Sequence, residues 1–181
     1  MDKPPRTQGS ARPRIAPPAP PHAAPTRAGR PGEVAVETLG LDPFARLTLV
    51  LLRFHFQTFA QPDSQGWLTA LRAATVHVGP RAAGPLCYDL VALVQALRHA
   101  RRSCFTFNRP DCGCCSGWLT AEERHLMQVL SAVRRGQKGA ALTHALLLCE
   151  GNAAEDLVAM AEVYARRYAP DGAPPACARP T

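Results

Sequence analysis

Residues 42–62 read DPFARLTLVLLRFHFQTFAQP, and this segment sets the architecture that we expect for the whole chain. Asp42 can accept hydrogen bonds from the free backbone N–H groups at a helix start, and Pro43 fits the first helical position. Pro62 ends the pattern, because proline lacks the N–H group that a helix interior needs. The segment therefore predicts one long helix between Pro43 and Pro62.

The composition of this helix predicts a central place in the fold. Its apolar side chains cover a wide face and include Phe44, Leu47, Val50, Leu51, Phe54 and Phe59. Arg46, Arg53 and Gln57 form only a narrow polar stripe. A helix that is apolar on most sides packs against neighbours around most of its circumference. His55, between two phenylalanines, is expected to be a hydrogen-bonded core or boundary residue rather than a ligand.

Five further helices are predicted on the C-terminal side of this segment. They are a short helix after Ser64 and helices from near Pro85 to Arg102, Thr120 to Arg135, Gly139 to Glu150 and Asn152 to Tyr168. Thr120 and Glu123 have the spacing of a capping box, which marks a helix start. Residues 75–80, TVHVGP, fit either a strand or a helix end, and strand signals are weak elsewhere. We therefore expect an all-α fold, a compact bundle of five to six helices whose last three members pack antiparallel.

The distribution of proline and charge divides the chain into one domain and two tails. Residues 1–32 hold nine of the eighteen prolines and six basic residues against one acidic residue, so most of the net charge of +7 lies there. Such a segment buries too little apolar surface to offset the entropy of ordering it. We expect a disordered Pro/Arg-rich tail over 1–32, a single helical domain over 33–168 and a second short disordered tail over 169–181.

Several classes of protein are disfavoured by what the sequence lacks. It has no apolar run of about 18 residues, so we expect no membrane span. Polar and proline-rich residues follow Met1, where a secretory signal would be apolar, so we expect a cytoplasmic protein with seven reduced cysteines. The nucleotide-binding, serine-hydrolase, zinc-protease and EF-hand motifs are also absent, which disfavours an enzyme without excluding one.

The most informative motif is a cysteine loop at 104–117, CFTFNRPDCGCCSG, which holds four of the seven cysteines. Cys112 and Cys115 form a CxxC pair, and two thiolates three residues apart in a turn can reach one metal ion. Zinc needs four ligands, so Cys104 is the expected third. The fourth is left open between Cys114, His99 and His125. We expect Cys114 to bind the same ion as its neighbour Cys115 only with strain.

Two other chemistries remain open for this loop. An iron–sulfur cluster is possible because it needs only thiolate ligands. The spacing of these cysteines matches neither ferredoxin pattern, and a cluster that used all of them would have to be shared across a homodimer. A thiol redox sensor is favoured by Arg101, Arg102 and Arg109, because nearby cations lower a thiol pKa. A CxxC oxidoreductase is disfavoured, since no strand precedes the pair and the next helix starts only at Thr120.

Three functional hypotheses follow from the sequence. The first is a non-catalytic helical interaction or regulatory protein with a protein partner, whose cysteine loop binds a metal ion, with zinc favoured over iron–sulfur. The second is a thiol redox sensor or a small iron–sulfur protein that uses the CxxC, with Cys112 and Cys115 as attacking and resolving thiols in the redox case. The third and least favoured is nucleic-acid binding through the basic tail, because scattered arginines attract phosphate without reading bases. Glu122 and Glu123 at the start of one helix would also repel phosphate.

Overall fold

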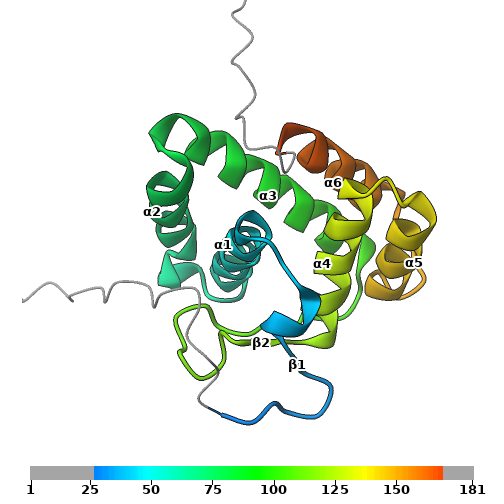
Figure 1. Ribbon diagram of the computed structural model, residues 1–181, viewed down its shortest axis with the longest axis horizontal. Coiled ribbons are helices and arrows are strands. Elements are labelled where there is room, and N and C mark those ends of the chain that lie inside the picture. Colours follow the sequence, from blue (N-terminus) through cyan, green and yellow to red (C-terminus); the bar gives the residue numbers. More distant parts are fainter. Residues whose placement is uncertain (1–26, 169–181) are drawn as a thin grey trace, which may run out of the picture.

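The computed structural model describes residues 27–168, and these form a helical bundle, which confirms the all-α fold (Figure 1). Residues 1–26 and 169–181, which make up most of the two predicted tails, lie outside the described part. The α-helices are α1 (Pro43–Ala60), α2 (Gly66–Val78), α3 (Pro80–Ala100), α4 (Ala121–Arg134), α5 (Lys138–Leu148) and α6 (Glu155–Arg167). Short 3-10 turns, η1 (Val36–Leu39) and η2 (Pro62–Ser64), flank α1. None of the helices within residues 27–168 combines the length and the hydropathy that a membrane-spanning segment needs.

Helix α1 lies at the centre of the bundle, as its composition predicts. In Figure 1 it is seen nearly end-on, with α2, α3 and α4 around it. The Asp42 carboxylate caps it by accepting a hydrogen bond from Ala45 N at 2.7 Å. Two of the three residues predicted as a polar stripe, Arg53 and Gln57, are nevertheless buried. Arg53 can be buried because Glu123 of α4, 70 residues later in the sequence, supplies a carboxylate partner. Local periodicity does not reveal so distant a partner.

The α2–α3 connection differs from the prediction. Helix α3 begins at Pro80, five residues earlier than expected, and Pro85 lies inside its second turn. A proline there removes one backbone hydrogen bond but does not end the helix. The break between the two helices is Gly79, whose φ of 81° is accessible to glycine at little cost. The segment TVHVGP is therefore the end of α2 and the start of α3 rather than a strand.

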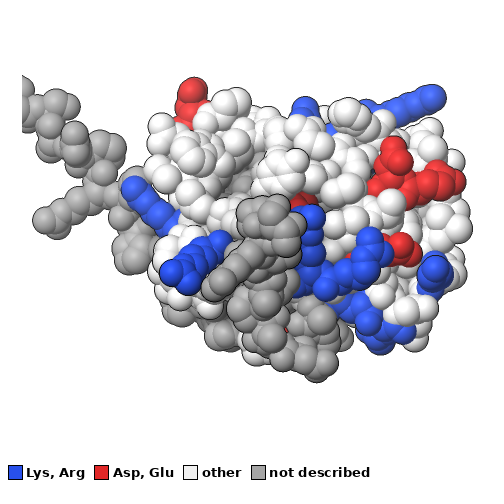
Figure 2. All heavy atoms as spheres, turned by 90° about the horizontal axis from the view of Figure 1, so that it is seen from above, with Lys and Arg blue, Asp and Glu red and all other residues white. Residues whose placement is uncertain are grey.

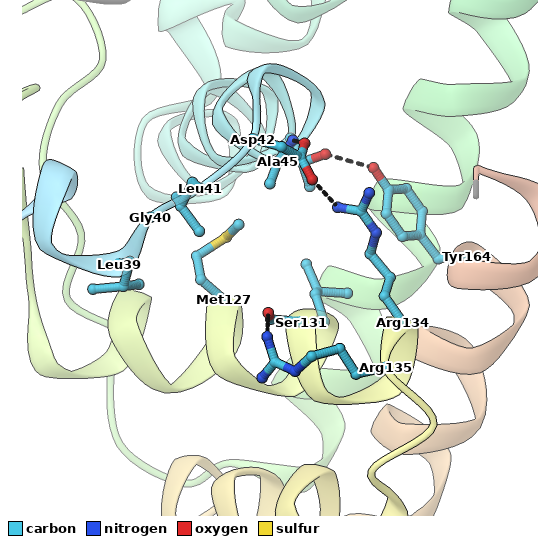
Figure 3. A pocket seen from close by; sticks show the side chains of 12 residues that line it. Leu39, Gly40, Leu41, Asp42, Ala45, Met127, Ser131, Arg134, Arg135 and Tyr164 are labelled. Atoms are coloured by element: carbon cyan, nitrogen blue, oxygen red, sulfur yellow. Dashed lines mark hydrogen bonds and ion pairs between the residues drawn. The ribbon is translucent and has the colours of Figure 1, made fainter. Parts of the chain in front are cut away.

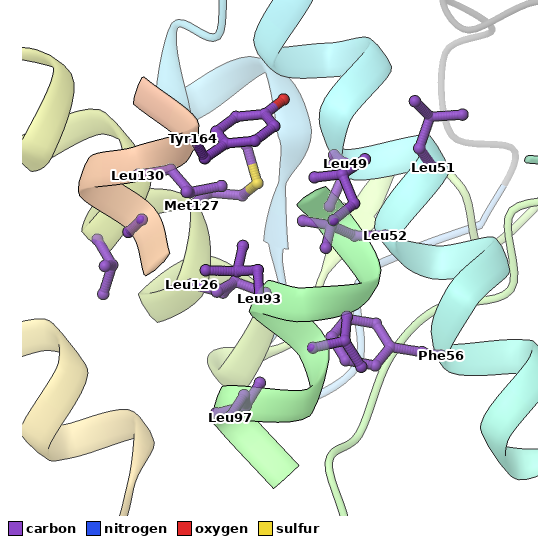
Figure 4. Close-up of a cluster of buried hydrophobic side chains, with 14 of the residues drawn as sticks. Leu49, Leu51, Leu52, Phe56, Leu93, Leu97, Leu126, Met127, Leu130 and Tyr164 are labelled. Carbon is purple, nitrogen blue, oxygen red and sulfur yellow. The ribbon is translucent and has the colours of Figure 1, made fainter. Parts of the chain in front are cut away.

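The C-terminal half of the domain consists of α4, α5 and α6, which pack on one another. The predicted capping box of α4 is confirmed, because Thr120 Oγ1 accepts from Glu123 N at 3.1 Å and Glu123 Oε2 accepts from Thr120 N at 3.0 Å. Helices α4 and α6 meet α1 and α3 in one continuous core. Figure 4 shows Leu52, Leu93 and Leu126 among the side chains that converge there from α1, α3 and α4.

One element was not expected from the sequence. Strand β1 (Val34–Ala35) pairs antiparallel with β2 (Trp118–Leu119), with Val34 opposite Leu119 and Ala35 opposite Trp118. Two-residue strands leave too short a pattern to be recognised, and their partners are far apart in the sequence. This small sheet ties the chain before α1 to the end of the cysteine loop.

Candidate metal centre

The cysteine loop runs from the end of α3 to β2 and brings three thiols together. Cys112 Sγ lies 3.0 Å from Cys114 Sγ, and Cys114 Sγ lies 3.7 Å from Cys115 Sγ. All three sulfur atoms are within 4.8 Å of one another, and the side chains are only partly buried. For comparison, four sulfurs bound tetrahedrally to zinc at about 2.3 Å are about 3.8 Å apart. The Cys114–Cys115 separation is close to this value, and the Cys112–Cys114 contact is shorter.

Consecutive turns place these three thiols together. Cys115 N and Ser116 N both donate to Cys112 O, at 3.0 and 2.9 Å, and Cys112 N donates to Arg109 O at 3.3 Å. The chain therefore curls tightly at the CGCC sequence. Cys114, which we expected to share an ion with Cys115 only under strain, is the cysteine whose sulfur contacts both of the others.

A buried ion pair anchors the C-terminal end of the loop. Arg53 of α1 contacts Glu123 of α4 through Nε and Oε1 at 2.7 Å, and each side chain is 1% exposed. The same guanidinium donates to the backbone carbonyls of Ser116 and Trp118. Asn108 adds a further link, because its backbone N–H donates to Glu123 and its side-chain amide donates to Trp118 O. The segment just after the thiols is thus fixed to the core of the bundle.

Aromatic packing anchors the N-terminal part of the loop. Phe105 stacks on Phe56 of α1 with ring centroids 4.1 Å apart, and Phe107 lies 5.8 Å from the same ring. Stacked aromatic pairs add stability beyond the apolar area that they bury. The aromatic contacts and the buried ion pair thus hold both sides of the thiol turn against the core of the bundle.

Cys112 and Cys114 differ in acidity. Hydrogen bonds from the side chains of Cys114 and Cys115, together with their backbone amides, lower the pKa of Cys112 to about 7. The side chains of Cys112 and then Cys115 raise the pKa of Cys114 to about 11. The arrangement therefore stabilises one thiolate at Cys112 near neutral pH, which is the form that binds metals and attacks electrophiles.

Two arginines lie beside the thiols, and only one of them was expected. Arg109 pairs with Asp111 at 2.8 Å and interacts electrostatically with Cys112 and Cys115. Arg27 also interacts electrostatically with Cys115, although it precedes that cysteine by 88 residues and gave no signal in the sequence. Arg101, which we also expected near the thiols, instead donates from its guanidinium to Leu148 O at 2.6 Å.

The other predicted ligands lie outside this group of three thiols. Cys104 is exposed at the start of the loop, and His99 is exposed near the end of α3. His125 is hydrogen-bonded to His144 of α5, with 3.1 Å between the Nδ1 atoms. Within residues 27–168, no fourth Cys, His, Asp or Glu joins the three sulfurs at ligand distance.

A separate hollow lies between the start of α1, α4 and α6 (Figure 3). Its volume of about 250 Å³ is slightly below the range of most small-molecule sites. Its polar groups already pair with one another, as Asp42 with Arg134 at 2.9 Å and Tyr164 with Thr48 at 2.7 Å. This hollow therefore offers a ligand fewer free polar groups than the cysteine loop does.

Both signs of charge occur on the face of the domain that Figure 2 shows. On the face shown in Figure 2, basic and acidic side chains lie among one another rather than in one basic surface.

No protein-family model, curated protein or solved structure matches this chain significantly. Inference about function therefore rests on the chemistry of the site itself.

Proposed function

We propose that this protein is a non-catalytic helical interaction or regulatory protein that binds one zinc ion through Cys112, Cys114 and Cys115. The observation that carries the proposal is the convergence of the three sulfur atoms within 4.8 Å of one another. Thiolates are soft ligands and select zinc, copper(I) and iron–sulfur clusters over magnesium or calcium. Zinc is the ion we favour, because it accepts three sulfurs and leaves a fourth position for another donor.

The open fourth position favours interaction with a partner. A structural zinc site normally has four protein ligands, whereas the described residues supply three. Water or a donor from a partner protein completes the tetrahedron in our proposal. The bound ion would then hold the loop in one conformation and couple it to the partner. Because the ligands have to stay reduced, we place this activity in the cytoplasm.

Elemental analysis of the full chain, purified without oxygen, tests the proposal. We expect about one zinc per chain in the wild type and loss of zinc in each of Cys112→Ser, Cys114→Ser and Cys115→Ser. Cys104→Ser is the matched control, since Cys104 lies in the same loop but outside the group of thiols, and Cys177→Ser controls for the C-terminal segment. Both controls should retain zinc.

Three results would overturn this assignment. Wild-type protein that holds no metal and has freely titrating thiols would do so, as would wild-type zinc content in all three cluster variants. Iron in the purified protein, together with a visible absorption band, would mean that the loop binds an iron–sulfur cluster rather than zinc. Circular dichroism of each variant shows whether a loss of metal reflects loss of the ligand or loss of the fold.

A redox switch is the second candidate, favoured by the Cys112 pKa of about 7 and the 3.0 Å contact with Cys114. With a hydroperoxide as oxidant, the Cys112 thiolate attacks one peroxide oxygen. The O–O bond breaks, Cys112 becomes a sulfenic acid, and the leaving oxygen departs as water or alcohol after protonation. The Cys114 sulfur then attacks the sulfenic sulfur, and a disulfide forms with release of water.

Mass spectrometry separates the two candidates. A redox switch predicts a loss of two hydrogens per chain in the metal-free protein after peroxide treatment, and a trapped sulfenic acid in a variant that combines Cys114→Ser with Cys115→Ser. A zinc site predicts that bound zinc protects the thiols from this oxidation. Absence of any disulfide between Cys112 and Cys114 after treatment of the metal-free protein would exclude the switch.

A further inference from the structure

Helix α5 keeps an apolar face uncovered at the edge of the bundle. In Figure 1 it lies at the outside of the molecule beside α4 and α6, the helices against which it packs. Its buried residues lie on the inner side and are Ala141, Ala145 and Leu148. On the outer side Leu142 is 40%, Leu146 37% and Leu147 59% exposed. These three are half of the large exposed apolar side chains within residues 27–168, and such a concentration on one surface marks an interaction site.

The exposed face runs from small side chains at one end to large ones at the other. Its members form one continuous arc of the helix surface and are Gly139, Ala140, Leu142, Thr143, Leu146 and Leu147. At the N-terminal end, a Cβ on Gly139 would meet no atom within 4 Å. The two bulkiest exposed neighbours, Leu146 and Leu147, lie at the C-terminal end. Thr143 lies between them and donates its hydroxyl to Gly139 O at 2.9 Å, so its donor is already satisfied within the helix.

Charge changes along α5 in the same direction. Arg135 and Lys138 are exposed at its N-terminal end, whereas Glu155 and Asp156 are exposed at the start of α6, just after its C-terminal end. None of these four side chains forms an ion pair within residues 27–168. Each copy of the chain therefore carries a basic group and an acidic group at opposite ends of α5, and both lack a counter-charge.

We propose that two copies of this chain associate through α5, with the two helices antiparallel about a two-fold axis near Thr143. A two-fold interface uses the same surface on both subunits, so that surface has to complement itself. Antiparallel pairing brings Leu147 of one copy over Gly139 of the other, and the basic end of each helix to the acidic end of its counterpart. Parallel pairing would bring like charges together. This self-complementarity in size and charge assigns the face to a second copy, independently of the proposed zinc site.

The length of α5 limits the strength of this dimer. Its 11 residues span about 16 Å. A stable interface buries about 800 Å² on each partner, which is more than one face of so short a helix provides. We therefore expect a weak dimer whose population depends on the protein concentration.

Sedimentation equilibrium of the full chain, with reductant present, tests the inference at protein concentrations from about 1 µM to about 1 mM. We expect a monomer–dimer equilibrium for the wild type. Leu147→Glu introduces a charge into the apolar contact and should raise the dimer Kd at least about 10-fold. Val76→Glu makes the same kind of change at an 82% exposed position of α2 and should leave the Kd unchanged.

Two further variants test the antiparallel orientation. Lys138→Glu brings like charges together at both ends of the interface and should weaken the dimer, most strongly at low salt. Thr143→Cys places a thiol beside the two-fold axis. Mild oxidation should then link residue 143 of one copy to residue 143 of the other, and mass spectrometry of the digested dimer identifies that link.

Four results would overturn the inference. A wild type that stays monomeric at the highest concentration would leave this face to a different protein. Equal Kd values for Leu147→Glu and Val76→Glu would place the interface elsewhere, and absence of the link at residue 143 would exclude the antiparallel geometry. A dimer that dissociates with chelator, while circular dichroism shows intact helices, would assign the association to a shared metal ion.

Discussion

The guanidinium of Arg53 lies 2.7 Å from the carboxylate of Glu123, and each of the two side chains is only 1% exposed. This pair joins the central helix α1 to the start of α4, and its members also hold the backbone of Ser116, Trp118 and Asn108. Buried charges are tolerated when partners satisfy them in this way, and a single buried charge is costly. The same buried ion pair therefore connects the core helices with one another and with the candidate metal loop.

Removing one member of this pair should therefore be strongly destabilising. Arg53→Met leaves Glu123 buried without its counter-charge, and we expect a loss of about 3–5 kcal/mol in the free energy of unfolding. Urea denaturation followed by circular dichroism measures it. Arg72→Met, at an exposed position of α2, is the control and should change stability by less than about 0.5 kcal/mol. Similar effects for the two variants would show that the ion pair does not hold the fold.

Zinc should stabilise the folded chain by mass action. A ligand that binds only the folded state adds about 2.7 kcal/mol when its free concentration is 100 times the Kd. We expect the thermal midpoint of the wild type and of Cys104→Ser to rise with added zinc and to fall again with chelator. Cys114→Ser should show no such rise. A midpoint that rises equally in Cys114→Ser would place the zinc elsewhere.

Stability should fall at acidic pH because of a buried histidine. His55 is 3% exposed, its Nε2 lacks a partner, and burial lowers its pKa from 6.5 to about 4. Between these values the unfolded chain binds a proton that the folded chain does not, so stability is lost as the pH falls through this window. The loss at pH 4 is about 3 kcal/mol.

The variant His55→Leu tests this dependence, since it removes the titrating group. Urea midpoints measured at intervals from pH 7.5 to pH 4 should fall less steeply for the variant than for the wild type. Parallel curves for the two proteins would show that His55 is not the group responsible.

Two glycines in helices should respond to alanine in opposite directions. A Cβ at Gly66 would lie 2.4 Å from Phe54 O, where α2 begins against α1, so Gly66→Ala should cost about 1–3 kcal/mol. A Cβ at Gly84 of α3 would meet no atom within 4 Å. Gly84→Ala should therefore stabilise the protein by about 0.5–1 kcal/mol, the usual gain of alanine over glycine within a helix. Thermal midpoints of the two variants check both signs, and a fall for Gly84→Ala would contradict the reasoning.

The helix starts that could be predicted are those set by neighbouring residues. Asp42 caps α1, and Thr120 with Glu123 caps α4, through hydrogen bonds that span three residues. The start of α3 was predicted too late, because Pro85 was taken as a helix start and is instead accommodated after Pro80. His55 is buried as predicted, but its Nε2 is not hydrogen-bonded.

Apolar periodicity, helix caps and the CGCC spacing act over a few residues, so the presence of the helices and the position of the thiols could be predicted from the sequence. The surroundings of the thiols depend on contacts between distant segments and became visible only in the folded protein. The fold brought Cys114 into contact with Cys112 and Cys115 and left Cys104, His99 and His125 apart from them. These relationships depend on chain reversals and on pairing between distant segments, as in β1 with β2 and Arg53 with Glu123. Such contacts form only when burial in a common core offsets the entropy of bringing the segments together.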